Sequence, residues 1–151
     1  MQIDNWIPRL EQLLLTIWVG SLLAIGYLAV PVLFHSLEDK ILAGQLAGQM
    51  FHIVNLIGIT SGFVLLLLAY MQDSQGFIRQ RRTWHIIAML LLTLIAMLIL
   101  QPQMEAIKAQ TGWHDIAELK AQFGRLHGIS SVLYLLTSIF GVVLVVAKMR
   151  R

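Results

Sequence analysis

Residues 126–147 read LHGISSVLYLLTSIFGVVLVVA, a run without Asp, Glu, Lys or Arg. A helix of about 20 apolar residues is long enough to cross the hydrocarbon layer of a bilayer, which is about 30 Å thick. Three further runs of the same kind occupy residues 12–34, 51–72 and 83–104. We therefore predict an all-α integral membrane four-helix bundle, formed by a single polytopic domain over residues 1–151.

The composition supports a membrane protein and excludes several kinds of site. Of the 151 residues, 58% are hydrophobic and 13% charged, whereas a soluble domain carries about a quarter charged residues. The chain has no cysteine, which excludes disulfides, iron–sulfur clusters and thiol nucleophiles. The net charge is +3, but the basic residues flank the apolar runs. This placement indicates a lipid bilayer as partner and no nucleic acid.

The distribution of Lys and Arg predicts the orientation. With four spans, the termini and the second loop share one side and hold seven of the eleven basic residues. Because cytoplasmic loops carry the excess of Lys and Arg, we expect both termini inside and a multi-pass protein of the bacterial inner (cytoplasmic) membrane. The segment 105–125 is predicted as an amphipathic periplasmic connector between the third and fourth spans, since Ala-Glu-Leu-Lys-Ala-Gln at 117–122 favours a helix.

Three histidines share the outer boundary of the predicted membrane. His35 ends the first span, His52 begins the second and His127 begins the fourth. Ionisable residues at membrane depth are costly and usually face the interior of a bundle, so each is a candidate for a functional site. The alternative interpretation is that each is an interfacial residue, because an amphipathic ring is favoured at the membrane surface.

A second polar layer lies deeper. Tyr27 and Tyr134 are eight and seven residues from His35 and His127 on helices that run in opposite directions, which places them roughly 10–12 Å further into the membrane. With Asn55 on the second span and Ser131 on the fourth, these side chains predict a polar, outward-opening pocket between the first, second and fourth spans.

Several chemistries fit such a pocket. Imidazole binds copper, zinc and haem iron, so His127, His52 and His35 are predicted metal ligands, with a copper ion as first candidate. Two of them are alternatively axial ligands of a haem, or the pocket relays protons or holds a small polar solute. No catalytic carboxylate pair, phosphate loop or metalloprotease motif is present. We expect a binding protein rather than an enzyme.

Three short motifs resemble a bacterial four-helix membrane family of unknown function. They are Val-Pro-Val-Leu-Phe at 30–34, Ala-Gly-Gln-Leu-Ala-Gly-Gln-Met-Phe at 43–51 and Phe-Gly-Arg-Leu-His-Gly-Ile-Ser-Ser at 123–131. That family is grouped with the animal transmembrane protein two-hundred-and-five, which is linked to platinum-drug resistance, and is remotely similar to membrane copper-resistance D proteins. The resemblance implies metal handling. It supports His127 more firmly than His35 or His52, and the residues that match its pattern are Pro31, Phe34, Gly44, Phe51, Phe123, His127 and Ser131.

The sequence thus leads to three functional hypotheses. The first is an inner-membrane binding or transport protein with a periplasm-facing polar pocket that handles a transition metal such as copper. The second is a haem-binding subunit of a membrane oxidoreductase. The third is a non-enzymatic scaffold or small-solute permease with interfacial histidines. Small residues at Gly44, Gly48, Gly124 and Gly128 would suit a homo-oligomer in any of these.

Overall fold

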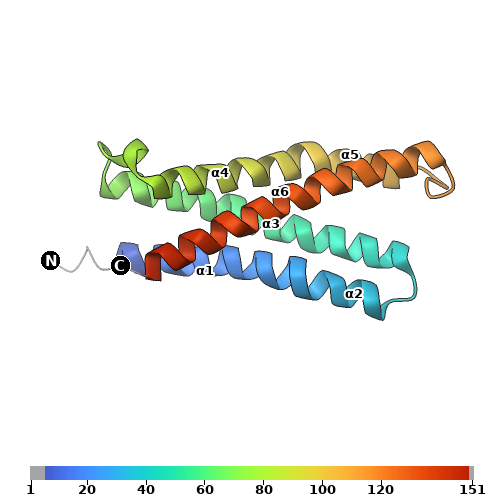
Figure 1. Cartoon of the computed structure of the whole chain (residues 1–151), viewed down its shortest axis with the longest axis horizontal. Helices are drawn as coiled ribbons and strands as arrows, with labels where there is room; N and C mark the ends of the chain where they lie inside the picture. Colours follow the sequence, from blue (N-terminus) through green and yellow to red (C-terminus); the bar gives the residue numbers. More distant parts are fainter. Residues whose placement is uncertain (1–5, 150–151) are drawn as a thin grey trace.

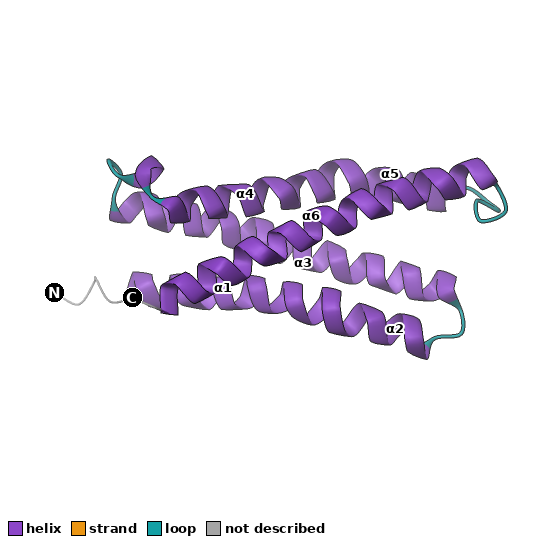
Figure 2. Ribbon diagram, in the orientation of Figure 1, coloured by secondary structure: helices purple, strands orange, loops and turns teal. Residues whose placement is uncertain are grey.

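The computed structural model describes residues 6–149, which form long helices joined by turns at residues 37–39, 73–80 and 109–116 (Figure 2). Arg150 and Arg151, two of the seven basic residues counted for the orientation, lie outside the described residues. The elements in chain order are α1 (Trp6–Ala24), the π-helix η2 (Ile25–Ala29), α2 (Val30–Ser36), α3 (Lys40–Gln72), the 3-10 helix η3 (Phe77–Arg79), α4 (Arg81–Ile95), the π-helix η4 (Ala96–Leu100), α5 (Gln101–Lys108) and α6 (Ala117–Met149).

Four continuous helices are long and apolar enough to cross a membrane, as the sequence predicts. They are Trp6–Ser36, Lys40–Gln72, Arg81–Lys108 and Ala117–Ala147, and they contain 28 to 33 residues. At 1.5 Å per residue they are about 42–50 Å long, so each extends well beyond a hydrocarbon layer of about 30 Å. The chain is a multi-pass, all-helical membrane protein.

The segment predicted as a separate connector helix, 105–125, is divided between two membrane helices instead. α5 continues to Lys108, and α6 begins at Ala117 and runs without a break into the apolar run. The chain turns between them at Gly112, whose φ of 72° is unfavourable for residues with a side chain. Residues 117–122 are helical, as their composition predicts, and this helix continues into the apolar run of residues 126–147.

The four long helices pack differently at the two ends of the bundle (Figure 1). We call the end with the turns 37–39 and 109–116 the open end. The closed end holds the start of α1, the turn 73–80 and the end of α6. At the open end α2 packs on α3, and α5 packs on α6, so that two helical hairpins lie side by side. Towards the closed end α1 and α4 each pack against both α3 and α6.

The core of the protein lies in the closed half, where Trp18 of α1 is fully buried. Its indole lies directly on α3, because Gly58 has no side chain there: a Cβ at Gly58 would be 2.5 Å from Trp18 Nε1. Small residues permit this kind of close approach between membrane helices. The other residues of the buried cluster are Leu15, Val19, Leu22, Val54, Leu65, Ile86, Met89 and Leu144.

A buried polar contact joins three helices at the closed end. Glu11 of α1 is 2% exposed. Its Oε2 lies 2.8 Å from Arg82 Nη2 of α4, and its Oε1 accepts a hydrogen bond from Gln72 Nε2 of α3 at 2.7 Å. Because a buried charge is costly unless it is paired, this contact fixes the positions of α1, α3 and α4 relative to one another.

Both π-helices precede a proline at the same spacing. η2 ends at Ala29, two residues before Pro31, and η4 ends at Leu100, two residues before Pro102. Proline lacks an N–H, and its ring clashes with the carbonyl four residues earlier in an α-helix. A wider π turn accommodates this conflict without ending the helix. For this reason the third long helix passes Pro102 and continues beyond its apolar run of residues 83–104 to Lys108.

Candidate functional site

A cavity of about 840 Å³ lies between the two hairpins in the open half of the protein. It is lined by residues of η2, α2 and α3 on one side and of η4, α5, α6 and the turn 109–116 on the other. The π-helix η2 contributes to the first side, between α1 and α2, and η4 contributes to the second side, between α4 and α5. The cavity therefore exists because the hairpins separate above the tightly packed core.

Tyr134 of α6 forms the inner wall of the cavity. Its hydroxyl donates a hydrogen bond to the Leu22 carbonyl of α1 at 2.7 Å, one turn before η2. Its ring packs edge-on against Phe51, with centroids 5.1 Å apart, and lies 6.1 Å from the ring of Tyr27. This position depends on Gly26, because a Cβ there would lie 2.8 Å from the Tyr134 hydroxyl and would overlap its ring.

Aromatic side chains also line the mouth of the cavity. The Trp113 ring lies 3.7 Å from His114 and 4.8 Å from Phe123, and the Phe123 ring stacks on His127 with centroids 6.0 Å apart. All four residues line the cavity. Lys108 Nζ lies 5.8 Å from the centroid of the Phe123 ring, within the range of a cation–π contact. The turn 109–116 is thus fastened to α6 by ring packing.

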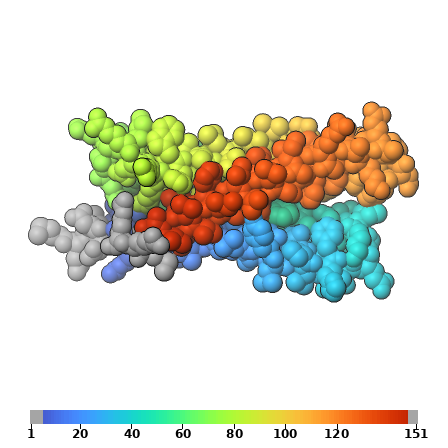
Figure 3. Space-filling view, viewed as in Figure 1, coloured from blue at the N-terminus to red at the C-terminus, as the bar shows by residue number. Residues whose placement is uncertain are grey.

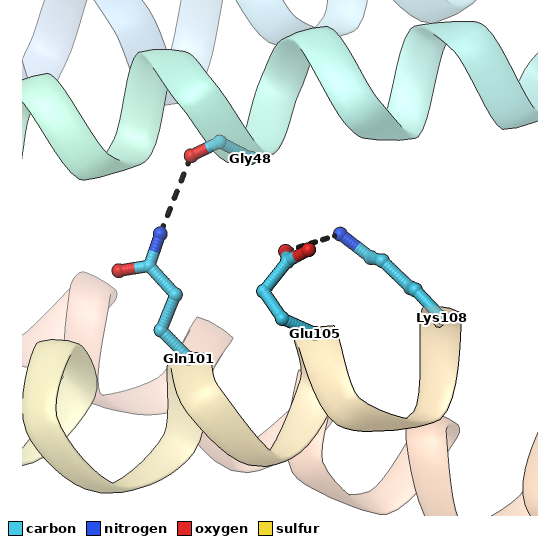
Figure 4. Close-up of polar contacts among 4 residues, drawn as sticks. All are labelled: Gly48, Gln101, Glu105 and Lys108. Carbon is cyan, nitrogen blue, oxygen red and sulfur yellow. Dashed lines mark hydrogen bonds and ion pairs between the residues drawn. The ribbon is translucent and has the colours of Figure 1, made fainter. Parts of the chain in front are cut away.

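A polar stripe on α5 faces α3 (Figure 4), and its residues line the cavity. Gln101 Nε2 donates to the Gly48 carbonyl at 3.4 Å, and one and two turns further along α5 Glu105 pairs with Lys108 at 2.9 Å. The ion pair lies against Gly48, where a Cβ would be 3.4 Å from Lys108 Nζ. On the other hairpin, Lys40 Nζ donates to the Phe34 and Leu37 carbonyls at the end of α2.

The floor of the cavity is apolar apart from a few uncharged polar groups. Asn55 of α3 is 9% exposed and lines the cavity. Its side-chain amide is open to the cavity and has no hydrogen-bond partner among residues 6–149. The hydroxyls of Thr93 and Thr137, which also line the cavity, donate to the carbonyls of Met89 and Leu133 at 2.8 Å. Asn55 is therefore the side chain at this depth that has both a donor and an acceptor available.

The structure brings together five of the seven predicted site residues. His127, Tyr27, Asn55, Ser131 and Tyr134 all line the cavity. Ser131 is turned back to its own helix, since its hydroxyl donates to the His127 carbonyl at 2.8 Å.

The structure does not bring the other two histidines to this cavity. His52 lines a separate hollow of about 250 Å³ with Met97, Pro102 and Glu105, and His35 lines neither space. Successive residues of a helix differ by about 100° in direction, so His52 and its neighbour Phe51 face different surroundings at nearly the same depth. Among the described residues, no group of three His, Cys, Asp or Glu side chains is arranged to hold a metal ion.

Some residues of the cavity were not predicted from the sequence. Trp113 and His114 were expected on a solvated connector, yet they line the mouth. Gln101, Glu105 and Lys108 were assigned to a span end and a connector. Their spacing of four and three residues places them on one helical face, which is a signal that the sequence does contain.

The family comparison gives the last finding on the site. Neither a curated protein nor a solved structure matches the chain significantly. A family model described as a domain of unknown function, DUF4149, matches residues 13–112, from α1 to the turn before α6. This match covers about two thirds of the chain, including the α2–α3 wall of the cavity, and the chain therefore belongs to the DUF4149 family, whose function is not known.

Proposed function

We propose that this protein is a binding or transport protein of the bacterial inner membrane that takes a small amphipathic molecule into the cavity between its two hairpins. The observation that supports this most strongly is the cavity itself, at about 840 Å³. Pockets for small molecules typically measure about 300–1,000 Å³ and combine mostly apolar walls with a few placed polar groups. The aromatic wall around Tyr134 and the polar groups of Asn55, Gln101 and Lys108 have this composition.

The charges around the cavity favour a neutral or anionic ligand. Glu105 is the one carboxylate among the described residues that line it, and it is paired with Lys108. Lys40 adds a further positive charge at the mouth. A cationic ligand would meet this excess of positive charge without a free carboxylate to receive it.

We further propose that the open end faces the periplasm. The closed end carries Arg79, Arg81 and Arg82 in or beside its turn, and cytoplasmic ends of membrane helices carry the excess of Lys and Arg. Ligands would then reach the cavity from the outer half of the membrane or from the periplasm.

The copper, haem and homo-oligomer hypotheses stay predictions. Of the three histidines proposed as copper ligands, His127 alone lines the cavity, together with His114 and Met104. For haem, two histidines would need to face each other across an open space, whereas Trp113 and Phe123 lie between His114 and His127 in the row of rings. The amphipathic ligand needs no such rearrangement, so we place it first.

A matched pair of glycine substitutions tests the proposal. At Gly44, which lines the cavity, a Cβ would meet only Phe34 Cζ, at 3.9 Å, so that Gly44→Leu fills the space without a backbone clash. At Gly124 on exposed α6 surface, a Cβ would meet nothing within 4 Å. Gly124→Leu therefore makes the same chemical change outside the cavity.

The measurement is native mass spectrometry of protein extracted from membranes in a mild detergent. We expect wild-type protein and Gly124→Leu to retain a co-purified amphipathic molecule and Gly44→Leu to lose it. If the wild type carries no such molecule, or if Gly44→Leu retains it equally, the proposed function is rejected.

A further inference from the structure

The floor of the cavity contains an amide that is open to the cavity and has no partner among the described residues. Asn55 is 9% exposed, lines the cavity and makes no hydrogen bond to any other described residue. A buried polar group without a hydrogen bond is costly, and such groups in native proteins usually have a partner. Because the amide of Asn55 is open to the cavity, its partner is a molecule held in the cavity, either water or a ligand.

The surroundings of Asn55 limit what that partner can be. Asn55 is fifteen residues after Lys40 on α3, so it lies about 22 Å from the start of the helix, deep in the membrane. The lining residues from the middle of the other long helices include Leu22, Leu92, Thr93, Leu133 and Thr137, none of them charged. An ionised group would lose its hydration here without a counter-charge. The buried end of the ligand is therefore a neutral group with hydrogen-bonding oxygens or nitrogens.

The walls above the floor suit a flat ring. Tyr134, Phe51 and Tyr27 surround the cavity with rings held by mutual contacts at 5.1 and 6.1 Å. Aromatic rings pack best against other planar rings in offset or edge-on arrangements. Tyr134 is fixed in this position by its hydrogen bond to Leu22, so this wall is formed before a ligand binds.

Two side chains of the cavity lining, one on η2 and one on α6, are half exposed. Tyr27 and Leu135 line the cavity and are each 49% exposed at the surface. Figure 3 shows that α6 runs beside the α1–α2 helix. A hydrocarbon tail could extend from the cavity to the lipid at this place without crossing the polar mouth.

We propose that the ligand is a neutral ring that carries carbonyl or hydroxyl oxygens on an apolar tail, the chemistry of a membrane quinone, and that Asn55 is the residue that binds the ring oxygen. This rests on the proposed function, since it names the ligand class of the same cavity. A fatty acid or phospholipid fits less well, because its charged head would stay at the mouth near Lys40 and Lys108 and its chain would leave Asn55 unpaired.

The test compares two probes on purified protein in mild detergent: decyl ubiquinone, followed by quenching of tryptophan fluorescence, and oleate, followed by native mass spectrometry. Trp113 at the mouth is close enough to report a ring in the cavity. The variants are Asn55→Leu, which removes the amide, and Gln49→Leu, the same kind of change on an exposed position of α3 outside the cavity. Gly44→Leu and Gly124→Leu serve as the filled-cavity variant and its control.

We expect decyl ubiquinone to bind wild type, Gln49→Leu and Gly124→Leu alike. Loss of one neutral hydrogen bond in Asn55→Leu should weaken binding about 3- to 10-fold, and Gly44→Leu should abolish it. Equal affinity of Asn55→Leu and wild type overturns the inference. If oleate binds and decyl ubiquinone does not, and if Gly44→Leu loses the oleate binding, the inference about the ring is overturned while the proposed function stands. If Gly44→Leu changes the binding of neither probe, both the inference about the ring and the proposed function are rejected.

Discussion

Replacing Gly26 by Ala tests whether Tyr134 positions the wall of the cavity. The Tyr134 hydroxyl donates to the Leu22 carbonyl, and its ring lies on the backbone at Gly26. A Cβ at Gly26 would overlap the Tyr134 atoms Cε1, Cζ and Oη. The ring cannot simply move away, because Phe51 packs against it on the cavity side with centroids 5.1 Å apart.

The expected change in the free energy of unfolding combines two costs and one gain. Overpacking of this kind costs about 1–3 kcal/mol, and displacement of the ring also loses its hydrogen bond to Leu22, a contribution of about 1 kcal/mol. Replacing glycine in a helix returns about 1 kcal/mol through helix propensity. We therefore expect Gly26→Ala to lower the free energy of unfolding by about 1–3 kcal/mol. In a Tyr134→Leu background, which lacks the overlapping atoms, the same change should be neutral or should stabilise by up to about 1 kcal/mol.

The assay is equilibrium unfolding in mixed micelles with increasing sodium dodecyl sulfate, followed by circular dichroism, on the wild type and the variants. Tyr134→Phe provides the matched control, since it removes only the hydroxyl and keeps the Cε1 and Cζ atoms that a Cβ at Gly26 would meet. Gly26→Ala should thus remain destabilising in the Tyr134→Phe background. Equal effects of Gly26→Ala in the wild-type and Tyr134→Leu backgrounds would refute the close-approach argument.

Three further predictions concern the closed end, the orientation and the copper hypothesis. Glu11→Gln removes the charge that pairs with Arg82 at 2.8 Å, and we expect it to lower the free energy of unfolding by roughly 1.5–3 kcal/mol in the same detergent titration; no change would mean that the contact does not hold the helices. The chain has no cysteine, so the single variants Gln75→Cys and Gln110→Cys, both exposed in turns, report the orientation directly. A membrane-impermeant maleimide should label Gln110→Cys in intact cells and Gln75→Cys only after the cells are opened. The reverse pattern contradicts the proposed orientation. If copper is bound at the cavity, titration of His127→Gln should show a lower stoichiometry than titration of the wild type, whereas equal binding by both rejects His127 as a ligand.

The membrane helices were predictable because their signal lies along the chain. A run of apolar residues of the right length predicts a span from composition alone, and all four predicted runs lie inside helices of the structure. The residues at which these helices begin and end were less predictable. Pro102 is a residue that often ends a helix, but the π-helix η4 before it lets the helix continue as α5. The composition at 117–122 does not indicate that this helix is the start of α6.

The depth of each polar side chain in the membrane follows from the sequence alone, because each residue of a helix adds a rise of 1.5 Å. Counting residues thus predicts that Tyr27 and Tyr134, from opposite ends of the chain, share one depth, and in the structure their rings lie 6.1 Å apart. Only the tertiary structure decided which residues of one layer face each other, because that depends on how each helix is rotated and on which neighbour it packs against. His52 and Phe51 illustrate the difference: they are adjacent in sequence, yet Phe51 lines the large cavity and His52 a separate hollow.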